Sequence, residues 1–187
     1  MKKVLKTLIL IPFILLIAYL SYYNNHQFWR HYKTDNFKTL IEYNGVNIKG
    51  LRGRQILIHK EFKKYIIKID SFASKHRIGL IINQGYRYKN QLLRKSIVKP
   101  AKLSNHHAGF AIDFNIKCEG RKYFAKDLKR KNLLKLPKNI QGFIYDIRKN
   151  KDLRWGGDFK QQDPIHIDIP INIKNRKKWI DFEKTVH

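Results

Sequence analysis

The pattern of apolar and polar residues changes several times along the chain, and each change predicts an element. Over residues 59–77 apolar side chains recur every three or four positions, which is the spacing of an amphipathic helix. The isoleucine-rich run "IGLIINQGYR" (78–87) then predicts a strand that ends near Gly85.

Later segments continue this mixture of helices and short strands. "GFAIDFNI" (109–116) and "IHIDI" (165–169) alternate as strands do, and the latter is bounded by prolines. Helices are predicted at residues 89–97, 121–136 and 137–150. Separate helices and strands favour an α+β fold, a small antiparallel sheet flanked by helices, over regular βαβ winding.

The N-terminus has a different pattern. Three lysines precede an apolar run from Leu8 to Leu20, and no small-residue cleavage site follows it. This predicts a membrane anchor or uncleaved signal over residues 1–23, with the rest of the chain outside the cytoplasm. Secretion after signal cleavage is the alternative. Residues 24–50 are predicted to be a basic tether, and residues 51–187 a compact domain.

Composition narrows the classes of partner. The formal net charge is +26, while 43% of the residues are hydrophobic, so the chain can form a core and is not of disordered composition. Such a charge favours an anionic membrane or wall surface, or nucleic acid. Cys118 is the single cysteine, which excludes an intrachain disulfide and a multi-cysteine zinc site.

Histidines and carboxylates stand at spacings that suit a metal. In "SNHHAGFAID" (104–113), His106 precedes a glycine turn and Asp113 lies on the strand that follows. "DPIHID" (163–168) supplies His166 as a third candidate ligand and Asp163 as a spare carboxylate. Three protein ligands with one open position are typical of catalytic zinc, and a nearby carboxylate suits metal-assisted hydrolysis.

Neighbouring polar residues receive other interpretations. His107 is interpreted as a solvated neighbour of His106 and is not included among the ligands. Asp158 and Asp168 are interpreted as structural, although either could orient a ligand.

Three segments together resemble the zinc D-Ala-D-Ala peptidase superfamily, which includes VanY-type carboxypeptidases and L-alanyl-D-glutamate endopeptidases. "SNHHAGFAID" matches the signature S-x-H-x-x-G-x-A-x-D, and "NQGYRYKNQ" resembles the Gly-Tyr-Arg segment of the family. "RWGGDFKQQDPIHIDI" looks like the closing segment of the endopeptidase branch. The resemblance runs from about residue 56 to residue 169, with the motifs in family order.

The resemblance implies one zinc ion and a role for each matching residue. The ligands would be His106, Asp113 and His166, with Asp163 as the general base. Arg87 would bind the substrate carbonyl or carboxylate and, as a catalytic residue, stabilise the oxyanion. Trp155 would line the substrate cleft, and Ser104 would support the ligands from outside the donor set. From the residues alone, Arg87 could instead be structural or basic surface, and Trp155 a core residue.

The implied function is hydrolysis of peptide bonds in peptidoglycan stems by a protein that is expected to be monomeric and not to bind nucleic acid. Cleavage between L-alanine and D-glutamate is favoured, because the endopeptidase branch has Asp at the place of Asp163. A D-alanyl-D-alanine carboxypeptidase is the alternative. A third hypothesis is an inactive basic module that binds wall polymer or nucleic acid, since aromatic and basic residues interleave in "NNHQFWRHYK" (24–33).

Overall fold

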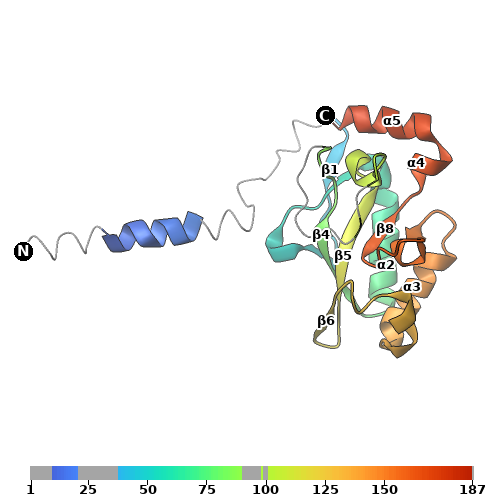
Figure 1. Ribbon diagram of the computed structural model, residues 1–187, viewed down its shortest axis with the longest axis horizontal. Coiled ribbons are helices and arrows are strands. Elements are labelled where there is room, and N and C mark those ends of the chain that lie inside the picture. Colours follow the sequence, from blue (N-terminus) through green and yellow to red (C-terminus); the bar gives the residue numbers. More distant parts are fainter. Residues whose placement is uncertain (1–9, 21–37, 90–97, 99–100, 187) are drawn as a thin grey trace, which may run out of the picture. The chain divides into compact units, whose positions relative to one another are not determined.

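The structure, a computed structural model, describes residues 10–20, 38–89, 98 and 101–186 (Figure 1). The chain divides into two compact units, Met1–Tyr32 and Lys33–His187. In the first unit, residues 10–20 form a helix. No helix within the described ranges is long and apolar enough to cross a membrane. The rest of the predicted anchor, residues 1–9 and 21–23, lies outside these ranges, so the anchor stays a prediction.

Two other predicted segments also fall outside the described residues. These are the aromatic and basic stretch at residues 24–33 and nearly all of the helix predicted at residues 89–97. Their structure therefore does not enter the description that follows.

The second unit combines short strands with helices. The strands are β1 Leu40–Glu42, β2 Ile48–Gly50, β3 Leu57–His59, β4 Gly79–Gln84, β5 Ala111–Cys118, β6 Arg121–Tyr123, β7 Arg154–Trp155 and β8 His166–Asp168. The α-helices are α2 Lys63–Lys75, α3 Lys138–Lys149, α4 Ile171–Lys174 and α5 Arg176–Thr185. Turns of 3-10 helix occupy Leu51–Gly53, Lys60–Phe62, Asn105–Ala108, Arg130–Lys135 and Gly156–Asp158.

The main sheet is mixed. Its strand order is β2-β4-β5-β8-β7, with β6 also paired to β5, and a separate antiparallel pair joins β1 to β3. The strands pair antiparallel except at one edge, where β2 runs parallel to β4. The predicted α+β class is confirmed, whereas the prediction of an antiparallel sheet is wrong at this edge.

The two faces of β5 differ in the residues that they carry and in what packs against them. Ile112, Phe114 and Ile116 on one face are fully buried, and α3 packs on that side with the Phe143 ring centroid 6.2 Å from that of Phe114. In Figure 1, helices α2 and α3 lie beside β4 and β5. The opposite face of the strand carries Asp113, which is only half-buried. The helices thus provide the core, and the face that they leave free presents polar groups.

Residues 38–50 belong to the folded domain, in contrast to the tether predicted for residues 24–50. Ile48 is fully buried, and β2 pairs with β4. The carboxylate of Asp70 on α2 accepts hydrogen bonds from the Val46 and Asn47 backbone amides at 3.0 and 2.9 Å and from the Tyr43 hydroxyl at 2.8 Å. The buried Asp70 carboxylate thus holds this segment against α2. A strand of three residues is too short for its alternation of apolar and polar residues to be recognised in the sequence.

The prediction of a helix at residues 121–136 is also wrong. Glu119 and Gly120 adopt positive φ angles of 50° and 74°, so the chain reverses and Arg121–Tyr123 pairs with β5 as β6. Asp127 then accepts a hydrogen bond from the backbone amide of Phe124 at 2.9 Å, a local turn that competes with a helix.

Candidate metal centre

Three predicted ligands come together at one point of the main sheet. Nε2 of His106 lies 3.2 Å from Oδ1 of Asp113 and 3.2 Å from Nδ1 of His166, and that Nδ1 lies 3.0 Å from the same Asp113 oxygen. A tetrahedral zinc ion with bonds of about 2.0–2.2 Å separates its donor atoms by roughly 3.3–3.5 Å. The three observed separations lie slightly below this range, and the donor set suits a single zinc ion after a small outward adjustment of its side chains.

Each ligand is placed by a different element. His106 lies on the 3-10 turn Asn105–Ala108, which ends at Gly109 with a positive φ of 73°. A Cβ at that glycine would also lie 2.6 Å from the backbone nitrogen of His59, so only glycine fits. Asp113 on β5 and His166 on β8 are direct partners in the antiparallel register. The turn and the strand pair together make the three donors converge.

Hydrogen bonds on the far side of each imidazole assign its nitrogens. Nδ1 of His106 lies 2.7 Å from the carbonyl oxygen of Gly85, which can only accept, so Nδ1 carries the hydrogen and Nε2 is free for a metal. Nε2 of His166 lies 3.3 Å from Oδ2 of Asp168, so Nδ1 is the metal-facing nitrogen. Asp168 therefore orients a ligand, which is one of the two roles that the sequence left open for it.

The site binds a proton strongly when no metal is present. Although burial alone would lower the pKa of His166, its hydrogen bonds to Asp113 and Asp168 raise that pKa to about 10. Burial alone would raise the pKa of Asp113, but His106 and His166 hold it well below its usual range. Because a ligating imidazole must be neutral, a metal ion has to displace this proton, and metal affinity rises with pH.

Asp163 stands apart from the three ligands but close to their charges. One of its carboxylate oxygens, Oδ1, is buried and has no hydrogen-bond partner among the described residues. Burial and the Asp113 carboxylate raise the pKa of Asp163, an effect that His166, His106 and Arg87 oppose. A carboxylate with a raised pKa and a free oxygen suits a general base that later acts as an acid.

Close main-chain packing determines the position of Asp163. Its backbone amide donates to the carbonyl of Gly156 at 2.8 Å, and its own carbonyl accepts from the His166 amide at 3.0 Å. A Cβ on Gly156 would lie 2.3 Å from the Asp163 carbonyl oxygen and 2.9 Å from Cβ of His166. Gly156 of the "WGGD" segment thus permits the close approach of the segment that carries Asp163.

Arg87 lies behind the turn that carries His106. Its backbone amide donates to the His106 carbonyl at 3.1 Å, and Nη2 donates to the hydroxyl of Ser104 at 3.1 Å. Burial lowers the pKa of Arg87, but an arginine stays protonated. The negative charges of Asp113 and Asp163 oppose that shift of the Arg87 pKa. The Ser104 hydroxyl holds Arg87 in place. Among the described residues, it forms no hydrogen bond with the three candidate metal ligands.

Trp155 does not have the position predicted for it. It is only 1% exposed, and its indole Nε1 donates to the carbonyl of Pro164 at 2.8 Å. The ring is too deeply buried to line a substrate cleft. Trp155 instead anchors the segment between Asp163 and His166, and the prediction of a substrate-binding role is corrected accordingly.

The structure also places His107 and Asp158, two polar residues near the candidate metal centre in sequence. His107 is buried, not solvated as expected, and burial lowers its pKa to about 4, but it is not part of the group of metal donors. Asp158 is exposed and forms a bidentate ion pair with Arg148 at 2.8 and 2.5 Å, which is a structural role.

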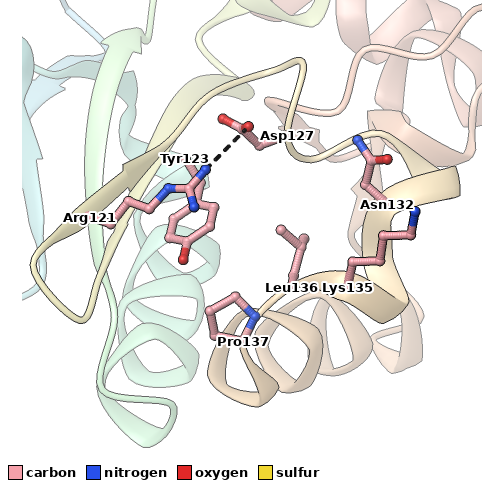
Figure 2. A pocket seen from close by; sticks show the side chains of 7 residues that line it. All are labelled: Arg121, Tyr123, Asp127, Asn132, Lys135, Leu136 and Pro137. Atoms are coloured by element: carbon pink, nitrogen blue, oxygen red, sulfur yellow. Dashed lines mark ion pairs between the residues drawn. The ribbon is translucent and has the colours of Figure 1, made fainter.

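A pocket elsewhere in the fold contains none of the site residues. It has a volume of about 210 Å³, and Figure 2 shows Arg121 and Asp127 on one side of it and Asn132 and Lys135 on the other. Its remaining lining residues are Tyr123 on β6 and Leu136 and Pro137, which directly precede α3. The candidate chemistry therefore does not lie in this pocket.

Comparison with known proteins agrees with the site. Residues 98–169 match the family model of D-alanyl-D-alanine carboxypeptidases, and this range includes all three ligands and Asp163. The likeness to this family thus covers the part of the chain that holds the candidate metal centre. A protein of Pasteurella multocida (strain Pm70), itself uncharacterised, is 39% identical over 44 residues, which are 24% of this chain and 17% of that protein. The chain thus spans only a small part of that relative.

The first prediction tests the ligands. Replacing His106, Asp113 or His166 with alanine should lower zinc affinity by more than the roughly 10- to 100-fold that loss of an outer partner costs, because each supplies a donor atom. Competition with a chromophoric chelator, starting from metal-free protein, measures this affinity. His107→Gln is the matched control and should keep its zinc. Retention of zinc by the ligand variants with loss in His107→Gln would show that the neighbouring histidine is the ligand.

Proposed function

We propose that this chain is a zinc-dependent peptidase that cuts the stem peptide of peptidoglycan between L-alanine and D-glutamate. One observation supports the chemistry above all others. The donor atoms of His106, Asp113 and His166 converge as zinc ligands do, and the Asp163 carboxylate nearby keeps a buried oxygen without a partner among the described residues. The family match independently supports a peptidase that acts on peptidoglycan.

The protein side chains divide the work of hydrolysis. A zinc ion in this site would act as a Lewis acid on the peptide carbonyl and make water more acidic. Asp163 takes a proton from the attacking water, and the water oxygen bonds to the carbonyl carbon. Asp163 then gives that proton to the amide nitrogen as the carbon–nitrogen bond breaks, which releases an amine and a carboxylate. Arg87 would donate hydrogen bonds to the carbonyl oxygen as its negative charge develops.

The choice of an endopeptidase depends on two linked features. The base is an aspartate, and it is seated against Gly156 of the "WGGD" segment through the 2.8 Å main-chain hydrogen bond. Both features resemble the endopeptidase branch, and the structure makes them parts of one packing arrangement. The description of the matching family favours the alternative, a D-alanyl-D-alanine carboxypeptidase.

The second prediction isolates the base. Asp163→Asn should keep near-stoichiometric zinc and lose at least about 100-fold in hydrolysis, because general acid–base assistance is typically worth 100- to 10,000-fold. Zinc content and turnover of purified peptidoglycan are measured on the same preparation. Asp158→Asn, which removes an exposed carboxylate paired with Arg148, is the control and should keep its activity. Loss of zinc from Asp163→Asn would make Asp163 a ligand or a support.

The third prediction concerns the bond that is cut. Purified peptidoglycan digested with the wild-type protein should yield new amino termini on D-glutamate and no free D-alanine, as mass spectrometry and end-group labelling can measure. Free D-alanine without new D-glutamate termini would establish the carboxypeptidase alternative. Absence of both products from a zinc-loaded protein would contradict a peptidase acting on stem peptides.

We further propose that the domain works outside the cytoplasm, at an anionic membrane or wall surface, with residues 1–23 as its anchor. The apolar run after the N-terminal lysines supports the anchor. Surface charge supports the location, because residues 121–138 carry eight exposed lysines and arginines but one acidic residue, Asp127. Release of a mature secreted protein is the alternative.

The fourth prediction separates an anchor from attraction by charge. The full chain should sediment with membranes and stay there in a high-salt wash, because burial of an apolar segment does not depend on ionic screening. Release by salt would indicate that charge alone holds the protein. A soluble product that begins near residue 21 would instead identify a cleaved signal.

A further inference from the structure

Asn105 connects the two segments that carry the histidine ligands. It lies next to His106 at the start of the 3-10 turn, and it is only 2% exposed. Its side-chain nitrogen donates to Oδ2 of Asp168 at 2.6 Å and to the carbonyl of Ile169 at 2.9 Å, and it lies 3.0 Å from Oδ1 of Asn172. Its side-chain oxygen accepts from the Asn172 amide at 3.3 Å. One side chain therefore joins the turn to the end of β8.

The Asp168 carboxylate is the point where these contacts meet the ligand. Arg154 holds it from the other side with two hydrogen bonds, Nε to Oδ1 at 2.9 Å and Nη2 to Oδ2 at 2.7 Å. Nε2 of His166 lies 3.3 Å from the same Oδ2 that Asn105 contacts. Asp168 is 2% exposed, so these protein donors take the place of water around it. The oxygen that receives the His166 hydrogen is thus held by Asn105 and Arg154.

We propose that Asn105 is a positioning residue for the metal: by holding Asp168, it directs Nδ1 of His166 toward the ion and couples the placement of both histidine ligands. This inference rests on the proposed zinc site. The side chain of Asn105 is itself engaged with Asp168, Ile169 and Asn172 and is not one of the proposed ligands. It acts through Asp168 on His166 and, along the chain, on the adjacent His106. Loss of the Asn105 amide leaves the acceptor oxygen with one fewer donor and frees the carboxylate to turn away from the imidazole.

A role limited to folding would give a different result. If Asn105 only joined the turn to β8, its removal would lower the stability of the metal-free protein and leave the zinc affinity of the folded molecules unchanged. A positioning role instead lowers the affinity itself. Outer partners of metal ligands are typically worth 10- to 100-fold in affinity.

The fifth prediction is that Asn105→Ala lowers zinc affinity by about 10- to 100-fold. Affinity is measured by chelator competition on metal-free protein whose folding has been verified by its thermal transition. Asn105→Asp, nearly identical in shape, should lower it at least as much, because it sets a second carboxylate against Asp168 and removes the donor. The visible absorption spectrum of the cobalt-loaded variants should also change, since it reports ligand geometry and not stability.

Asn139→Ala is the matched control. Its amide also joins segments 63 positions apart in sequence, by donating to the carbonyl of His76 at 2.8 Å, but it lies on α3 and contacts no part of the site. This variant should lose stability and keep the zinc affinity and cobalt spectrum of the wild type. If Asn105→Ala does not fold, Asn105→Asp decides the question.

A double-mutant cycle with Asp168→Asn tests the route of the effect. If Asn105 acts through Asp168, the two affinity losses are strongly non-additive, and Asn105→Ala costs little once Asp168 has been changed. Additive losses, or folded Asn105 variants with wild-type zinc affinity and spectrum, would overturn the inference. A wild-type protein that binds no zinc would overturn the proposed function instead, so the two failures can be told apart.

Discussion

The pairing of β5 with β8 is the constraint on which the rest of the site depends. In this register Asp113 faces His166 directly, and their side chains meet with Oδ1 and Nδ1 3.0 Å apart. A shift of one residue would turn His166 toward the helices and bring Ile167 onto the polar face. Fully buried Ile112 and Ile167, which are also partners in this register, prevent that shift. The apolar core thus fixes the register that brings the two candidate ligands together.

Groups outside the donor set determine which nitrogen each histidine can offer to a metal. A backbone carbonyl, Gly85 O, selects Nε2 of His106, whereas the carboxylate of Asp168 selects Nδ1 of His166. The two partners differ in their electrostatic effect. The carbonyl is neutral, but Asp113 and Asp168 raise the pKa of His166 to about 10, so a proton competes with a metal ion for this imidazole. Orientation of this ligand therefore carries a cost in metal affinity at low pH.

The elements that hold the ligands could be predicted from the sequence, because they carry strong local signals. Alternation identifies the strands around Asp113 and His166, and Gly109 indicates the turn between His106 and the strand that carries Asp113. The strand at residues 48–50 gave no such signal, since it is short and is held by Asp70 from a distant helix. Long-range hydrogen bonds of this kind, including the Asn105 to Asp168 contact, have no sequence period that could reveal them.

Trp155 illustrates how a correct motif can carry the wrong role. The family resemblance implies that Trp155 lines the substrate cleft, but its indole donates inward to the Pro164 carbonyl and is nearly fully buried. Gly156, next to it, accepts from the Asp163 amide at 2.8 Å. Trp155 and Gly156 together hold Asp163 and Pro164, which precede β8. Because these contacts to the main chain place Asp163, one oxygen of its carboxylate can lack a partner among the described residues. That is what a base requires: a fixed position, and a lone pair left free for the proton that it takes.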